Sequence, residues 1–248
     1  MKNIIILFLL SIMIPCKCQN KQEYNNQNKG KEVNNKNIEQ MEPNNEEMIV
    51  KKFDIATFNQ KNKYGKYEFT DANGVLVKQR IDDEFPSGKV NGYTERRSYP
   101  NSPYEYYNEY DASGNIVKSS TSFYYVNTGI AKQYDLSGNV IKETNFDLGY
   151  SFTIEMLIEK MKKEYEIDLL NKYAKVVWRY VDEKHLHIPI YKVEHSIDTP
   201  VAQYKDVYLI DGSTGEMLYK TKRPFKKDPF SASEPIEAEY AKSKETTK

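Results

Sequence analysis

The sequence predicts an α+β fold: an antiparallel sheet of β-hairpin repeats, followed by a small module of one helix and a second antiparallel sheet. Short alternating segments separated by Asp-x-x-Gly turns run from about residue 49 to 149, and such segments are typical of antiparallel hairpins. After Gly149 the apolar residues take helical spacing and then return to strand segments. We therefore predict a hairpin-repeat domain over 49–149 and an α+β domain over 150–227.

The hairpin region contains an internal repeat. The segment YDASGNIVK at 110–118 recurs as YDLSGNVIK at 134–142, and FTDANGVLVK at 69–78 is a weaker copy. In each copy the aspartate side chain can begin a turn, and the glycine supplies the positive φ that ends it. The repeat therefore predicts turns at 71–74, 111–114 and 135–138. We further expect a strand at 123–126 that turns at 127–129.

The second region begins with a helix. Ser151 or Thr153 can cap it, and apolar residues from Ile154 to Leu170 fall mostly at helical spacing. Strands are predicted at 175–181, 186–193 and 204–210, with a tight turn at 211–216 before another apolar segment. Trp178, the only tryptophan, is expected in the core of its strand.

The two ends of the chain differ in composition from the part that is predicted to fold. Residues 1–18 carry a short positive start and an apolar run, which is the pattern of a signal peptide. We expect residues 19–48 to be a disordered spacer and residues 228–248 a disordered tail, because both are polar and poor in apolar residues. The only cysteines, Cys16 and Cys18, follow the apolar run, and a disulfide between residues so close would be strained.

Three segments resemble known families. Residues 1–18 resemble a bacterial lipoprotein signal, which implies lipid attachment at Cys16 or, alternatively, Cys18; an ordinary secreted protein is the other possibility. Residues 104–147 resemble the MORN-variant hairpin repeat of antitoxin-like and surface lipoproteins. Their Tyr-Asp and Gly-Asn motifs are also similar to the YD repeats of toxin shells. Residues 152–222, with the turn DGSTGE at 211–216, resemble the PepSY domain. That resemblance implies an extracytoplasmic α+β module that binds or restrains peptidases and has no catalytic residues.

Composition and motifs narrow the function. The chain has 36 basic and 36 acidic residues, so no basic surplus predicts a nucleic-acid partner. No pattern for a nucleophile, a phosphate loop or a cofactor is present, and we expect no catalytic residue and no cofactor. His185 and His187 would share one face of a strand, but two histidines leave a metal site short of ligands. We predict surface histidines there and no metal.

Tyrosine is the most distinctive residue, with 21 copies. Tyrosines suit half-buried strands and also binding surfaces, where they add contact area at low entropic cost. We therefore expect a non-enzymatic envelope lipoprotein, at the membrane in the periplasm or on the cell surface, that binds a protein. An immunity or inhibitor protein against a toxin or peptidase is favoured; a structural protein that binds envelope polymers and an unrecognised hydrolase are the alternatives. The expected partner-binding residues are Tyr104, Tyr106, Tyr107, Tyr124 and Tyr125.

Overall fold

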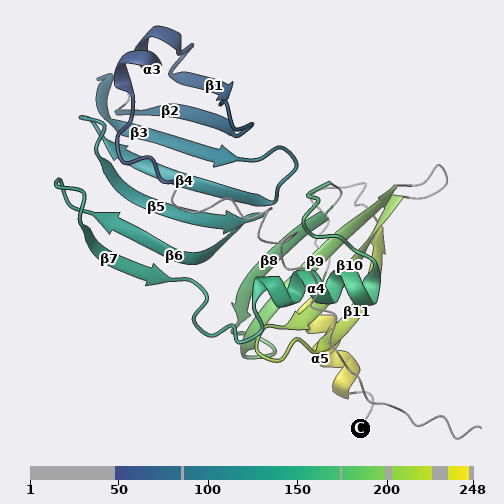
Figure 1. Cartoon of the computed structure of the whole chain (residues 1–248). Helices are drawn as coiled ribbons and strands as arrows, with labels where there is room; N and C mark the ends of the chain where they lie inside the picture. The colour runs from purple at the N-terminus through teal and green to yellow at the C-terminus, as the bar shows by residue number, and fades with distance from the viewer. Residues whose placement is uncertain (1–47, 85–86, 174, 199–202, 225–233, 246–248) are drawn as a thin grey trace, which may run out of the picture.

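The computed structural model describes residues 48–84, 87–173, 175–198, 203–224 and 234–245, and they form two antiparallel sheets and three short helices (Figure 1). The first sheet has seven strands in the order β1 to β7, and the second has four in the order β11-β10-β9-β8. Both are meanders, since each strand pairs with its neighbours in the chain. The first sheet and its helix are α3 Ile55–Lys61, β1 Lys66–Thr70, β2 Leu76–Glu84, β3 Lys89–Ser98, β4 Tyr104–Asp111, β5 Ile116–Phe123, β6 Val126–Tyr134 and β7 Val140–Asn145. The remaining elements are α4 Ile154–Tyr165, β8 Lys175–Asp182, β9 Ile188–Asp198, β10 Gln203–Asp211, β11 Met217–Pro224 and α5 Ile236–Glu245.

The three predicted repeat turns are confirmed and share one hydrogen-bond pattern. In each, the backbone N–H groups two and four residues after the aspartate donate to its Oδ1, at 2.8–3.0 Å. The glycines Gly74, Gly114 and Gly138 have φ between 79° and 81°, as the turn requires. Hydrogen bonds from Asn139 and its neighbours hold the pKa of Asp135 below its ordinary value. Burial opposes the same effect at Asp111, but the bonds from Asn115 and Ser113 prevail and its pKa is also lowered.

Residues 48–61 cover one face of the first sheet, which we name the inner face. Phe53 stacks on Tyr93 with ring centroids 4.5 Å apart, and its N–H donates to the carbonyl of Gly114 over 2.8 Å. Helix α3 follows, capped by Asp54, whose side chain accepts from Thr57, and buries Phe58 among the same rings. The sequence pattern did not predict this helix, because it is only seven residues long and Phe58 is its one buried residue.

The second sheet lies between two helices (Figure 1). Helix α4, capped by Thr153 as predicted, packs Leu157, Ile158 and Met161 on one face. It ends at Glu166, which has left-handed backbone angles, so the predicted continuation to Leu170 is wrong. Helix α5 packs on the other face, where Ile236 and Tyr240 bury Ile190, Val207 and Leu209. The prediction that residues 228–248 form a disordered tail is therefore wrong for residues 236–245.

One cluster of buried residues runs from the first sheet into the second. It joins Val77, Tyr106 and Phe123 of the inner face to helix α4, and helix α4 to Val193 and Ile210 of the second sheet. Arg179 of β8 strengthens this junction, and its side chain is only 5% exposed. The apolar cluster and the polar contacts of Arg179 together connect the two sheets.

Three predictions on single segments need correction or lie outside the described residues. The chain turns at Tyr124 and Tyr125, not at 127–129, and Tyr124 has φ +55°, as the first residue of a two-residue hairpin turn often does. Trp178 is 39% exposed and is not a core residue. The signal segment 1–18, with Cys16 and Cys18, and the spacer up to residue 47 lie outside the described residues, while Met48 is buried.

Candidate binding surface

The first sheet has a second, outer face that is open to solvent. Strand alternation along β4 directs Tyr104, Tyr106, Asn108 and Tyr110 inward, where all are buried, and the residues between them outward. Of the helices that the structure describes, α3 and α4 contact the inner face and α5 contacts the second sheet. No helix of the described chain therefore covers the outer face, whereas the inner face is covered apart from a hollow of about 400 Å³ over β4 to β6.

The five tyrosines expected to bind a partner divide between the core and this surface. Tyr104, Tyr106 and Tyr124 are buried, and the Tyr124 hydroxyl donates to the carbonyl of Leu169 over 2.9 Å. Burial raises the pKa of Tyr124, and the charge of Asp168 acts in the same direction. These three rings belong to the core, and each leaves at most 9% of its surface exposed. Tyr107 is half-buried on the outer face, and Tyr125 is 74% exposed.

Two adjoining hollows make a groove across the outer face. The larger, about 340 Å³, lies over β3 to β6. The smaller, about 180 Å³, lies over β1 to β4. Both are lined by Arg96 and Tyr107, and the Arg96 guanidinium lies 5.6 Å from the centre of the Tyr107 ring. This contact orients a cation and a ring together in the middle of the groove.

An aromatic pair from both sheets stands at one end of the groove. Tyr125, at the β5–β6 turn, stacks on Trp178 of β8 with ring centroids 5.7 Å apart and planes 28° apart. Lys192 of β9 places its Nζ 5.7 Å from the Trp178 ring. Sequence reasoning missed Trp178 as a surface residue. Alternation along β8 offered a signal, because Val177 and Trp178 are neighbours and only one of them can face helix α4.

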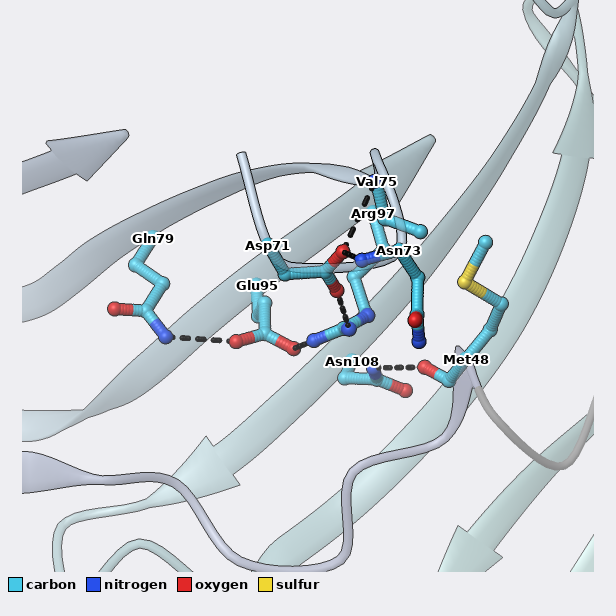
Figure 2. A network of polar contacts seen from close by, with 8 residues as sticks. All are labelled: Met48, Asp71, Asn73, Val75, Gln79, Glu95, Arg97 and Asn108. Carbon is cyan, nitrogen blue, oxygen red and sulfur yellow. Dashed lines mark hydrogen bonds and ion pairs between the residues drawn. The ribbon is translucent and has the colours of Figure 1, made fainter. Parts of the chain in front are cut away.

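The inner face holds a polar network that serves the fold (Figure 2). Gln79 Nε2 donates to Glu95 Oε2 over 2.7 Å, and Arg97 donates to Glu95 Oε1 over 3.2 Å and to Asp71 Oδ2 over 2.8 Å. Nearby, Asn108 Nδ2 donates to the carbonyl of Met48 over 2.9 Å, which fixes residues 48–61 on the sheet. These side chains are already engaged with one another, so we assign them a structural role.

His185 and His187 do not share one face of a strand, as the sequence suggested. They lie in the turn between β8 and β9, not on one face of a strand, and His187 has φ +57°. Within the described ranges, no group of three or more His, Cys, Asp or Glu side chains is placed to hold a metal ion. The helices of the described part of the chain are also too short or too polar to cross a bilayer.

Comparison with known proteins adds no family to this description. The chain matches no family model, no curated protein and no solved structure. The resemblances to the lipoprotein signal, the MORN-variant repeat and the PepSY domain therefore rest on the sequence alone. The open groove with its Tyr125–Trp178 end is the candidate binding surface.

Proposed function

We propose that the chain is a non-enzymatic binding protein of the bacterial cell envelope that holds a protein partner on the outer face of its first sheet. The observation that carries this proposal is the uncovered groove, which ends at an exposed stack of Tyr125 and Trp178. Exposed aromatic surface beside a hollow is typical of interaction sites. Tyr, Trp and Arg are also the residues that most often dominate binding energy at protein interfaces.

Two features of the surface favour a specific partner. The Tyr107 ring restrains the Arg96 guanidinium, and the Tyr125 ring restrains Trp178. Side chains that are ordered before binding lose less entropy on association, which favours affinity. Between these rings the groove is lined by side chains of both charges, Glu105 and Lys118 among them, as the rim of a protein interface usually is.

The proposed cellular role follows the sequence resemblances. We propose a lipoprotein anchored through Cys16 or Cys18, with a MORN-like repeat sheet and a PepSY-like module, which neutralises a toxin or peptidase in the envelope. The order of helix α4 followed by four antiparallel strands is compatible with the PepSY-like part of this proposal. An anchored inhibitor of this kind would act by covering the partner, and it needs no catalytic residue of its own.

The test is affinity capture with the full chain, followed by an activity assay on the captured protein. We expect the native chain to capture a toxin or peptidase and lower its activity. The double variant Tyr125→Ser with Trp178→Ser should bind about 100-fold more weakly, because two interface aromatics are lost. The matched control, Tyr64→Ser with Tyr173→Ser, removes two exposed aromatics that line neither hollow of the groove and should bind as the native chain does.

Two results would count against this function. Equal capture by the double variant and the native chain would remove the groove from the interface, provided both show the same thermal unfolding. Retention of envelope polymer in place of a protein, lost in the double variant, would favour the structural alternative. The stacked Tyr125 and Trp178 rings beside Ser122 and Asn127 are the observation that favours that second candidate, because sugars bind on exposed aromatic rings flanked by polar groups.

A further inference from the structure

The end of the groove over β1 to β3 carries like charges in direct opposition. In the register of the first sheet, Lys66 is opposite Arg80, and Lys78 is opposite Arg96. All four side chains are exposed and belong to the outer face. We name these four residues the cationic cluster. Cβ atoms of directly opposed residues are only about 4.5–5.5 Å apart, so like charges placed this way destabilise a sheet.

The acidic groups nearby do not neutralise the cationic cluster. Among the described residues that line the smaller hollow, Glu68 is the only carboxylate, against Lys78, Arg80 and Arg96. Arg96 reaches Glu105 only at 4.0 Å, where both side chains are largely in water. Lys78 and Arg80 form no ion pair with any residue that the structure describes, Glu68 and Asp82 included. Two cations are therefore left available to a partner.

Glu68 is opposite Lys78 in the register, but the two side chains form no ion pair, so the fold gains little from this arrangement. Elsewhere on the outer face the sheet uses opposite charges, as in the Lys118–Glu109 pair at 3.1 Å. Local rules that a protein breaks without structural gain are expected at its functional sites. The Arg96 guanidinium is also held by the Tyr107 ring, and such a planar fork suits bidentate binding of a carboxylate.

We propose that the cationic cluster binds an acidic, extended segment of the protein partner. This inference rests on the proposed function and names the chemistry of the partner at one end of the same groove. Lys78 and Arg80 are alternate residues of one strand, so their Cα atoms are about 6.5–7 Å apart. Carboxylates on alternate residues of an extended peptide have that same spacing. An acid-x-acid sequence lying along β2 can therefore meet both cations, with Arg96 beside them.

The test measures binding of short poly-L-glutamate to the full chain by calorimetry at low and raised salt. The native chain should bind it, with an affinity that falls as salt rises. The variant Lys78→Gln with Arg80→Gln should bind about tenfold more weakly, which corresponds to two exposed ion pairs. Its melting temperature should equal or exceed that of the native chain, because repulsion is removed.

The matched control is Lys89→Gln with Lys142→Gln, which removes two charges from exposed strand positions outside the cluster. It should keep the native affinity for poly-L-glutamate. Equal weakening in both double variants would overturn the inference, as would a lowered melting temperature in the cluster variant. Binding of linear polyphosphate but not of poly-L-glutamate would also overturn it, in favour of a phosphate polymer.

The same variants separate this inference from the proposed function. If a captured partner needs Tyr125 and Trp178 but binds the cluster variant with native affinity, the binding function stands and the acidic-segment inference fails. If the partner loses affinity for the cluster variant at low salt and less so at high salt, the inference is supported on the natural ligand.

Discussion

At the scale of single residues, Arg96 and Arg97 show how one strand serves two purposes. They are neighbours on β3, so their side chains point to opposite faces of the sheet. The Arg97 side chain is 14% exposed and bridges Glu95 and Asp71, while that of Arg96 is 60% exposed and lies in the groove. The sequence contains two adjacent arginines, and only the sheet shows which of them points to the inner face and has a structural role.

Replacing Arg97 with Met should lower the free energy of unfolding by about 3–5 kcal/mol, because Glu95 would remain buried without its cation. Urea unfolding measures this effect. The same substitution at Arg96 is the control and should cost less than about 1 kcal/mol. The double variant Glu95→Gln with Arg97→Met should recover part of the loss. If Arg97→Met were as mild as Arg96→Met, the network of Figure 2 would not stabilise the fold.

Residue-scale prediction from sequence succeeded where the cause was local. The Asp-x-x-Gly turns were found because the aspartate and glycine act within four residues. The tyrosines were harder, since Tyr124 and Tyr125 are adjacent and one is buried while the other is exposed. That difference depends on Leu169, which lies 45 residues away in the sequence and whose carbonyl accepts a hydrogen bond from the Tyr124 hydroxyl. No local pattern contains that information.

At the scale of elements, helix α5 was missed for a related reason. A ten-residue helix is marginal in water, so its stability must come from packing and not from its own propensity. Ile236 and Tyr240 lie four residues apart and meet the second sheet at Ile190, Val207 and Leu209. The residues around them are polar, so the segment was predicted to be a disordered tail. The predicted strands of the second sheet were confirmed because each is rich in β-branched and aromatic residues.

Replacing Ile236 with Ala should therefore lower the free energy of unfolding by about 2–5 kcal/mol, since a buried side chain leaves a cavity. Denaturant unfolding followed by tryptophan fluorescence is suitable, because the only tryptophan, Trp178, lies in the second sheet. Glu245→Ala, at the exposed end of the same helix, is the control and should change stability by less than about 0.5 kcal/mol. Equal effects of the two substitutions would show that α5 does not pack as described.

At the scale of the whole molecule, the binding surface depends on how the two sheets are joined. Tyr125 belongs to the first sheet and Trp178 to the second, so their stack exists only while the junction is closed. Arg179 holds this junction: its Nη1 donates to Asp147 Oδ1 over 2.6 Å, and its Nη2 donates to the carbonyls of Phe146 and Asn127. Burial lowers the pKa of Arg179, but its hydrogen bond to Asp147 and the negative charge of that carboxylate prevail and raise it.

Replacing Arg179 with Met should loosen the junction without removing either sheet. In the native chain the shared apolar cluster should make both sheets unfold in a single calorimetric transition. The variant removes the donor of two carbonyls and leaves Asp147 only the hydrogen bonds from Thr128 and Gly129, so we expect a loss of about 3 kcal/mol and a broadened or divided transition. The control Arg96→Met makes the same chemical change away from the junction and should keep one sharp transition. Because the Tyr125–Trp178 stack spans the junction, the Arg179 variant should also weaken partner capture at temperatures where both sheets remain folded. A single sharp transition in both variants would mean that the apolar cluster alone couples the sheets, and that Arg179 contributes only to local geometry.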